Sequence, residues 1–597
     1  MQDSTEKLTA EGELSFDLTS RPWLPVQRDD GTQDELSLRE VFAEAGALRR
    51  LVGDLPTQEF ALLRLLLAVA HDALDGPGDH ENWSELWADQ GCFEPVAGYL
   101  DDHRERFDLL HPVAPFFQVA GLRTARDEVF SLNRIVADVP NGEPFFSSRQ
   151  PTVRRLDFAE AARWVVHAHA YDTSGIKTGV AGDDRARGGK VYPLGVGWAG
   201  TLGGVFAEGD TLRETLLLNL IASDATDAIG PLRGDDRPAW RRPQSGPGPG
   251  AAGGRRPTGV RDLYTWQTRR LRLHFDAEGA HGVVLGYGDP LPAHTMRGSE
   301  PMTAWRRSRA QEKKRGEALV YLPREHDPSR SAWRGLAALI ANRAEAAGGS
   351  EAPLMLRPGV FEWIGRLVTE GALRPGFLIR ARVVGPVYGT QQSVIDEIVD
   401  DRLTMAVVLL HERDRAYARQ AIGAVSDADD AVRALGDLAT DLARASGGDQ
   451  EGPRATARDL GFGALDGPYR AWLGRVAEVG DPYEHRRTWQ REAYRVVAGL
   501  GDQLMADAGD AAWQGRIVEA KYGPGQGGKQ GAGQGGKHGG NQGGKQGGLW
   551  LNSALADQWF RGRLGKALSD PYSDRPPGPV PAPVPDRAPE SSPRVPV

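Results

Sequence analysis

The chain has 597 residues, of which 40% are hydrophobic, and a formal net charge of -9 with a pI near 5.9. This length predicts several domains with packed cores. The acidic balance excludes a protein that coats polyanions over its whole surface, although it permits a local basic groove. The one cysteine, Cys92, excludes an internal disulfide and a zinc site built from cysteines. Because a single cysteine fits a reducing compartment, and the most apolar early segment is too short to span a bilayer, we expect a cytoplasmic protein.

Residues 14–400 mix strand-like and helical patterns, whereas residues 1–13 are polar and indicate a disordered tail. A helix over 37–46 is predicted to begin at Ser37, since Glu40 follows at the capping-box spacing. The apolar segment 56–74 predicts a buried helix with Pro56 in its first turn.

A Pro- and Gly-rich segment over 242–259 predicts a flexible insertion, because an apolar pattern resumes directly after it. The next segment alternates Leu271, Leu273 and Phe275 with polar residues, so it indicates a half-buried strand with a basic face.

After residue 400 the pattern changes to long helices, predicted over 403–425, 428–445, 484–508 and 549–568. Short connections favour a four-helix bundle over 401–569. QGGK repeats at Gln526, Gln534 and Gln542 predict a Gly/Lys-rich linker over 523–548, and the Pro-rich residues 570–597 predict a disordered tail.

The centre of the N-terminal part is a Gly-rich, polar stretch with interleaved cations, including Lys177, Arg185, Arg187 and Lys190. Glycine lets a backbone approach a partner closely and cations attract phosphate, so this stretch is a candidate nucleic-acid contact. An ordinary surface loop explains the composition equally well. A second basic cluster over 304–315 is either an electrostatic footprint for nucleic acid or a solvated loop.

No motif in the chain supplies a complete catalytic site. Lys177 is not a P-loop lysine, because Ile176 and Tyr171 stand where glycines are required. His71 and Asp72 resemble part of a metal-dependent phosphohydrolase motif, or are a polar pair at a helix end. His167 and His169 are packed histidines or, alternatively, metal ligands. The sequence therefore favours a binding and scaffolding protein over an enzyme.

Several segments in this order resemble the CasA family, the large subunit of the type I-E CRISPR Cascade surveillance complex. They are FDLTSRPWLPV, HPVAPFFQV, AHAYDTSGIKTG, GGVFAEGDTLRETLLLNL, the TWQ at Thr265–Gln267 and the helical C-terminal part. The resemblance covers residues 14–569 and implies an α+β fold, with a large mixed α/β N-terminal domain followed by a C-terminal four-helix bundle.

The resemblance also implies a non-catalytic function. Such a subunit lies near the 5′ handle of the CRISPR RNA and recognises the protospacer-adjacent motif (PAM) of double-stranded target DNA. It promotes duplex opening and R-loop formation, and it recruits a helicase-nuclease. Further implied partners are the other Cascade subunits, namely the small-subunit dimer and the backbone and handle-binding subunits; no cofactor and no membrane are implied.

Family positions carry over to particular residues. The PAM-contacting glycine loop falls on Ser174, Gly175, Ile176, Lys177 and Thr178, and the glutamine that wedges the duplex open falls on Gln392 beside Ser393, with Gln391 as an alternative register. The loop that contacts the RNA handle falls near Phe145, Phe146 and Ser147.

Two departures from the family affect these expectations. Some members use a lysine finger after the TWQ-type strand, but this chain has no lysine between Lys190 and Lys313. His281 or one of the arginines then substitutes, or the contact is absent. Some members also hold zinc there through cysteines, which this chain lacks, so we expect no metal. The expected basic patch comprises Arg269, Arg270, Arg272, Arg306, Arg307, Arg309, Lys313 and Lys314.

Two rival hypotheses remain open at this point. One is a metal-dependent phosphohydrolase that uses His71 and Asp72. The other is a purely structural subunit whose loops only hold RNA, which predicts no dependence on the sequence of the PAM.

Overall fold

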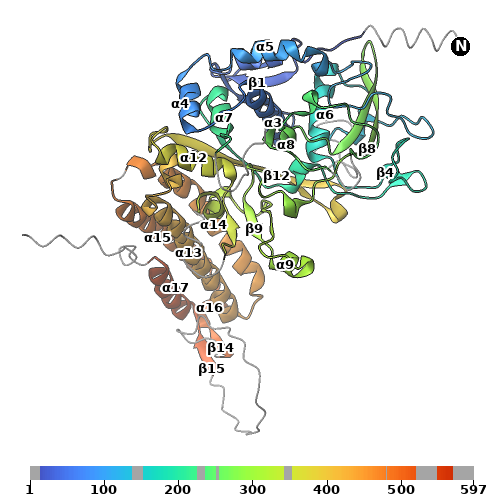
Figure 1. Ribbon diagram of the computed structural model, residues 1–597. Helices are drawn as coiled ribbons and strands as arrows, with labels where there is room; N and C mark the ends of the chain where they lie inside the picture. Colours follow the sequence, from blue (N-terminus) through green and yellow to red (C-terminus); the bar gives the residue numbers. More distant parts are fainter. Residues whose placement is uncertain are drawn as a thin grey trace, which may run out of the picture. The chain divides into compact units, whose positions relative to one another are not determined.

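The computed structural model describes residues 14–137, 152–224, 235–250, 255–341, 352–478, 480–519 and 548–568 (Figure 1). The chain forms two compact units. The first comprises Met1–Val425 and Asp466–Gly480, and the second comprises Ser426–Leu465 and Asp481–Val597. Helices and strands are mixed, so the predicted α+β class is confirmed.

A buried helix, α3 (Pro56–Ala73), forms the centre of the first unit and packs against α6 (Phe158–Tyr171) and α8 (Val260–Tyr264). Nearly every residue of α3 is buried, as its broad apolar surface predicts. The charged side chain of Arg64 is also buried, since it forms two hydrogen bonds of 2.9 Å with Glu300. The predicted capping box is present at α2 (Leu38–Ala43), where Ser37 and Glu40 cap each other.

Short antiparallel sheets surround this centre. The first has the order β2-β1-β3, and a hairpin of β7 and β8 follows later in the chain. A third sheet has the order β10-β9-β11. The bounds of these strands are Leu24–Arg28 (β1), Gln33–Leu36 (β2), Leu48–Leu51 (β3), Arg269–Asp276 (β7), Gly279–Tyr287 (β8), Trp305–Arg307 (β9), Tyr321–Pro323 (β10) and Met355–Leu356 (β11).

The remaining helices of the first unit are short. They are α4 (His80–Ala88), α5 (Pro95–Asp102), α7 (Leu212–Asn219), α9 (Arg309–Arg315), α10 (Leu336–Ile340) and α12 (Gly359–Thr369). The predicted insertion 242–259 is held by hydrogen bonds where it is described: Arg270 donates to the carbonyls of Gly246 and Gly248, and Gly250 N donates to Asp289.

The longest strands, β12 (Leu378–Tyr388) and β13 (Ile395–Ala406), form a hairpin. Strand β6 (Gly204–Glu208) pairs with the other edge of β12, so β12 is the central strand of this sheet. The predicted helix over 403–425 is therefore wrong at its start, because residues up to Ala406 belong to β13. Leu403 and Met405 are buried in the strand, and this alternation with polar residues has the period of a strand rather than a helix.

Long helices do follow. The predicted helices 403–425 and 428–445 are replaced by one helix, α13 (Ala416–Ser446), and the predicted helix 484–508 matches α15 (Pro482–Ala506). Helix α14 (Glu451–Gly474) was not predicted, because its glycines and Pro468 have low helix propensity. The last helix is α17 (Ser553–Ala567). That these helices form a four-helix bundle, and the domain limits 14–400 and 401–569, remain predictions.

A short helix and a hairpin complete the second unit: α16 (Asp510–Gln514), and β14 (Arg516–Glu519) paired with β15 (Gly548–Leu551). Most of the predicted linker 523–548 and the tails 1–13 and 570–597 lie outside the described residues; Gly548 begins β15. None of the helices in the described ranges has the length and apolar content needed to cross a membrane.

Candidate nucleic-acid interface

The predicted glycine loop and the predicted wedge are in direct contact, although they lie far apart in the sequence. Ser174 N donates a hydrogen bond to Gln392 O at 2.7 Å. The loop follows α6 and leads into β4 (Lys177–Thr178), which pairs with β5 (Lys190–Val191). Gln392 lies in the 3-10 turn Thr390–Gln392 between β12 and β13. The structure thus brings Ser174 and Gln392 together through their backbones.

A buried group of charged side chains, Asp172, Lys177 and Arg269, supports the glycine loop from the protein interior. Lys177 Nζ lies 2.7 Å from Asp172 Oδ2, and Arg269 also pairs with this carboxylate. Arg269 donates to the backbone oxygens of Asp172, Thr173 and Gly195 as well. Burial acts to raise the pKa of Asp172, but Lys177 and Arg269 together lower it below its ordinary value. Lys177 is therefore a brace inside the protein rather than an exposed phosphate contact.

The outer surface of the loop is apolar and open. Tyr287 OH donates to Gly175 O at 2.7 Å, so the carbonyl of Gly175 faces inward, whereas Ile176 is 58% exposed. A Cβ added to Gly175 would meet no atom within 4 Å. The fold itself does not require glycine here, and the open space is consistent with the close approach of a partner.

The hairpin tip carries two glutamines in a strained conformation. Gln391 and Gln392 have backbone φ angles of 56° and 55°, which residues other than glycine rarely adopt, and both residues are exposed. Gln392 N donates to Gly389 O at 2.9 Å, and Gly389 N donates to Val394 O at 3.0 Å. Such strain requires support from the surrounding structure and is typical of functional sites.

Tyr388 connects the hairpin to the end of α6. Its hydroxyl donates to Tyr171 O at 2.7 Å, one residue before Asp172. The ring lies against Gly200, where an added Cβ would be 2.2 Å from the Tyr388 hydroxyl. Burial raises the pKa of Tyr388 well above its ordinary value, so the hydroxyl stays protonated and remains a donor. Loop and hairpin tip are therefore joined at two points.

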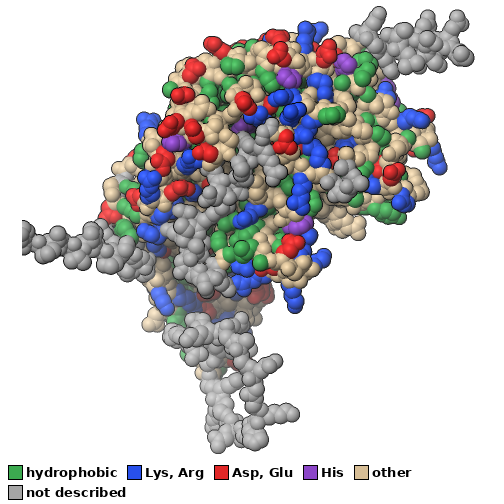
Figure 2. Space-filling model, in the orientation of Figure 1, with side chains coloured by type: hydrophobic (Ala, Val, Ile, Leu, Met, Phe, Trp, Pro, Cys, Tyr) green, Lys and Arg blue, Asp and Glu red, His purple; other side chains and the backbone are tan. Residues whose placement is uncertain are grey.

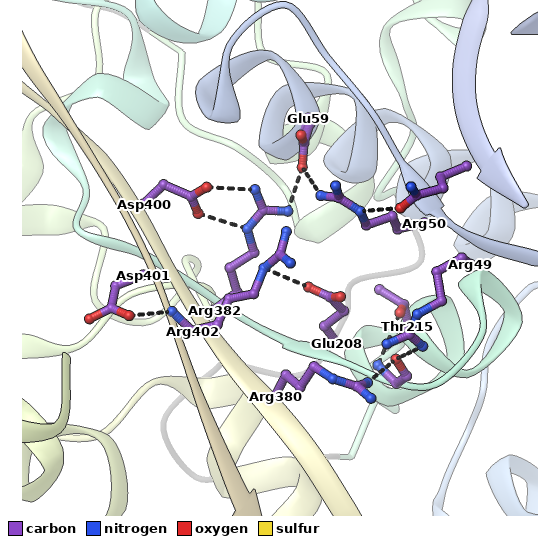
Figure 3. A network of polar contacts seen from close by, with 12 residues as sticks. Arg49, Arg50, Glu59, Glu208, Thr215, Arg380, Arg382, Asp400, Asp401 and Arg402 are labelled. Carbon is purple, nitrogen blue, oxygen red and sulfur yellow. Dashed lines mark hydrogen bonds and ion pairs between the residues drawn. The ribbon is translucent and has the colours of Figure 1, made fainter. Parts of the chain in front are cut away.

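Ion pairs fix the hairpin farther from its tip (Figure 3). Arg382 donates to Asp400 on β13 at 2.8 and 3.0 Å and to Glu59 on α3. On the neighbouring strand, Arg402 pairs with Glu208 at 3.5 Å. Arg380 and Arg49 both donate to Gly209 O, at 2.7 and 3.3 Å. These contacts hold the hairpin against α3 and β6.

Of the residues proposed to replace the lysine finger, only Arg269 contacts the segment next to the glycine loop, and it does so from the interior. Arg269 and Arg270 are buried, and Arg270 pairs with Asp289 at 2.8 Å, so neither belongs to a basic surface. Arg272 is half-buried. His281 is exposed, but it lies six residues from Tyr287 along β8, which is about 20 Å of strand. Neither Arg269 nor Arg270 is free to contact DNA in this structure.

The rest of the expected basic patch lies on β9 and α9. Arg306, Arg309, Lys313 and Lys314 are exposed, whereas Arg307 pairs with Glu312 at 2.7 Å. Figure 2 shows Lys and Arg side chains projecting from this region. The predicted RNA-handle residues Phe145, Phe146 and Ser147 lie outside the described residues.

The arrangement of His71 and Asp72 does not favour hydrolysis. Asp72 accepts hydrogen bonds from Tyr99 at 2.5 Å and from Arg241 and Arg261 at 3.0 Å. Burial lowers the pKa of His71 to about 3, and neither of its ring nitrogens has a hydrogen-bond partner among the described residues. Within those residues there is no group of three or more side chains arranged to hold a metal ion.

His167 and His169 are packed in the interior, as one of the two alternatives predicts. His167 Nε2 lies 3.0 Å from Thr57 Oγ1, and His169 Nε2 lies 2.8 Å from Phe117 O. Burial lowers their pKa values to about 3 and about 4.

Three residues that organise the site were missed from the sequence: Asp172, Tyr287 and Tyr388. Each acts through a partner distant in the sequence, and no local pattern indicates that partner. The only available signal was the position of Tyr388 at the end of a strand, directly before the turn that carries Gln392.

Comparison with known proteins identifies the family of this chain. Residues 17–500 match a family of CRISPR-associated proteins, and this covers more than half of the chain. The chain belongs to that family, described as CRISPR-associated protein Cse1, which confirms the resemblance to CasA.

Three relatives illustrate the similarity. The crystal structure of Thermobifida fusca Cse1 is 56% identical with a TM-score of 0.82, over 93% of this chain and 98% of that one. The Cse1 of Acidimicrobium ferrooxidans is 31% identical with a TM-score of 0.74, over 93% and 99%. The CasA/Cse1 of Thermus thermophilus is 30% identical over 337 residues, which are 54% of this chain and 60% of that protein. The aligned segment thus spans slightly less than two thirds of the length of this last relative.

Proposed function

We propose that this chain is the non-catalytic large subunit of a type I-E CRISPR RNA-guided surveillance complex. It recognises the PAM of duplex DNA, promotes R-loop formation and recruits the helicase-nuclease. Membership of the Cse1 family supports the assignment to the complex. Its partners are CRISPR RNA, double-stranded target DNA, the other Cascade subunits and the helicase-nuclease, in the cytoplasm.

One observation carries the DNA-reading part of the proposal: the hydrogen bond from Ser174 N to Gln392 O, which places the glycine loop beside the hairpin tip. Two tasks follow from reading a short motif in duplex DNA: the base edges in a groove must be contacted, and the adjacent base pair must be separated. An open glycine next to exposed side chains can lie in a minor groove, where recognition distinguishes A·T from G·C pairs. A side chain beside it can separate the adjacent pair.

The two elements have different tasks in this proposal. Ile176 is exposed and Gly175 has open space at its Cβ position, so these two residues contact the PAM duplex, while Lys177 and Arg269 fix the loop through Asp172. Gln392 lies at the hairpin tip, where backbone hydrogen bonds within the turn hold it in place, and its side chain acts as the wedge. The exposed cations of β9 and α9 supply sequence-independent attraction to phosphates.

A gel-shift assay of the reconstituted complex tests motif reading. The duplexes match the guide and differ only in the three flanking bases, at one fixed salt concentration. We expect flank-dependent binding that is lost without this chain and is weakened by Gly175→Val. Gly98→Val on α5 is the matched control, since an added Cβ there also meets no atom within 4 Å. Binding that ignores the flank would leave the chain a scaffold.

Gln392→Ala tests the wedge. We expect a lower R-loop yield at limiting DNA, with unchanged incorporation of the subunit into the complex. Gln391→Ala is the matched control, because Gln391 has nearly the same φ and is also exposed. If Gln391→Ala lowers the yield and Gln392→Ala does not, the wedge is in the alternative register; equal yields for both variants and the wild type contradict the wedge.

A further inference from the structure

The two-stranded ribbon of β4 and β5 has one buried face and one outer face. Lys177 pairs with Val191 in the register of the ribbon, and both side chains are buried, so this pair lies on the inner face. Because successive side chains of a strand alternate between the two faces, the next pair, Thr178 and Lys190, lies on the outer face. Lys190 is exposed there. The outer face therefore includes Thr178, the last residue of the glycine loop.

A second cation, Arg134, borders the same face. It ends the 3-10 turn Leu132–Arg134, and both this turn and β4 pack against β8. Arg134 Nη1 lies 3.5 Å from Thr178 Oγ1. The guanidinium also lies over the ring of Phe130, with Cζ 3.4 Å from the ring centroid, and the backbone of Phe130 is bonded to Val283 of β8. The ring and the hydroxyl thus hold an exposed guanidinium in place beside the glycine loop.

These two cations are not neutralised by the protein. Within the described ranges, Arg134 and Lys190 form no ion pair. Lys177, on the inner face, pairs with Asp172 instead. Partial burial lowers the pKa of Arg134, while Asp172 and Glu128 act to raise it from beyond ion-pairing distance. The outer cations are therefore available to an external anion, whereas the inner one already has its partner.

The position of the two cations indicates which anion they fit. The glycine loop is bonded to the hairpin tip through Ser174 and Gln392, the two elements proposed above to contact and open the duplex. A duplex in contact with this loop must place phosphates beside it, because it carries about one negative charge per 1.7 Å of its axis. Phosphate contacts fix the register of a protein on DNA. Arginine binds a phosphate through two parallel hydrogen bonds, whereas lysine acts as a point charge.

We propose that Arg134 and Lys190 bind the sugar-phosphate backbone of the duplex that carries the PAM, next to Thr178. Arg134 makes the contact that is fixed in geometry, and Lys190 adds charge from the opposite strand of the ribbon. This inference rests on the proposed function and adds to it the contact that fixes the position of the duplex on the glycine loop. The contact does not depend on the base sequence.

Fluorescence anisotropy of the reconstituted complex on guide-matched duplexes, at several salt concentrations, tests the proposal. The duplexes differ only in the three flanking bases. We expect the double variant Arg134→Gln, Lys190→Gln to weaken binding about tenfold, and by the same factor for every flank. The slope of log K against log salt should become shallower by about 1.8, because two phosphate contacts of about 0.9 each are lost. Arg134→Lys keeps the charge and should retain the wild-type slope.

The matched control is the double variant Arg21→Gln, Lys566→Gln, which removes the same charge. Both residues are exposed and form no ion pair in the described part of the chain, so affinity and salt slope should equal those of the wild type. An Arg134→Gln, Lys190→Gln variant with wild-type affinity and slope would overturn the proposal. So would a change in the preferred flank, since the two residues would then read bases. Loss of the variant subunit from the complex would also overturn it, since they would then contact RNA or a neighbouring subunit.

The same measurements separate this inference from the reading of the motif. Wild-type binding that ignores the flank contradicts motif reading, and the affinity and salt slope of the double variant then still decide whether the backbone contact exists. Flank-dependent binding that the double variant leaves unchanged contradicts the backbone contact alone.

Discussion

Two antiparallel hairpins of this protein present opposite chemistry to their surroundings. The β12–β13 hairpin has long strands, a short turn and a polar tip, and buried ion pairs hold it in place. The β14–β15 hairpin has four residues in each strand, is held by a small apolar cluster, and exposes Ile517 and Trp550. The two hairpins therefore differ in the contacts that hold them to the rest of the protein. Directional ion pairs hold the β12–β13 hairpin, whereas the β14–β15 hairpin is held by apolar packing on one of its faces.

Among the changes that test this difference between the hairpins, Arg382→Met should cause the largest loss in the free energy of unfolding. Arg382 is nearly buried and pairs with both Glu59 and Asp400. Burial already raises the pKa of Glu59, and removal of its partner leaves a buried carboxylate. We expect a loss of about 3 kcal/mol in the free energy of unfolding, measured by urea denaturation.

Arg380→Met is the matched control for this change. Arg380 pairs with Asp210, whose side chain is mostly exposed, so the expected loss is below about 1 kcal/mol. Equal losses for the two variants would contradict the assignment of the anchor to Arg382.

Acid should destabilise the first unit, in which His167 and His169 are buried on α6. The folded pKa values of His167 and His169, about 3 and about 4, lie below the ordinary value of 6.5. Their neutral forms are therefore stabilising above pH 6.5, and that stability is lost as the pH falls from 6.5 toward the folded pKa. The slope is about 1.4 kcal/mol per pH unit for each histidine.

Melting temperatures between pH 7.5 and 5 measure this loss. His167→Gln should flatten the dependence, whereas His281→Gln, at an exposed position, should leave it unchanged. A dependence that His281→Gln reduces and His167→Gln does not would contradict the assignment of this loss to His167.

Tyr388→Phe should have a smaller effect on stability but a specific effect on duplex opening. The variant keeps the ring and loses the hydrogen bond to Tyr171 O, which contributes about 1 kcal/mol. We expect a lower R-loop yield at unchanged PAM preference, measured on the reconstituted complex. Tyr192→Phe, at an exposed tyrosine, is the control; a yield that Tyr388→Phe leaves unchanged would argue against the coupling of loop and tip.

The smallest effect should be a gain. Gln392→Gly removes the strain of a positive φ, so we expect the free energy of unfolding to rise by about 0.5–1 kcal/mol while the R-loop yield falls. Ser393→Gly, at a φ of -88°, should lower stability instead. A Gln392→Gly variant that is destabilised would show that this backbone is not strained.

The sequence predicted those features that depend on local signals. The capping box at Ser37 and the buried helix over 56–74 both follow from short patterns. It could not predict that Lys177 and Arg269 meet at Asp172, because ion pairing between distant segments leaves no periodic trace. The sequence pattern places Leu403 and Met405 in a helix because the end of β13 and the start of α13 are both rich in apolar residues, so the boundary between strand and helix is not visible.

The link between Ser174 and Gln392 joins two backbone atoms, and neither side chain takes part in it. Residue types at the tip and in the loop can therefore change while the two segments stay together. Under the proposed function, Ile176 and Gln392 are the positions at which motif preference is expected to vary with little effect on folding.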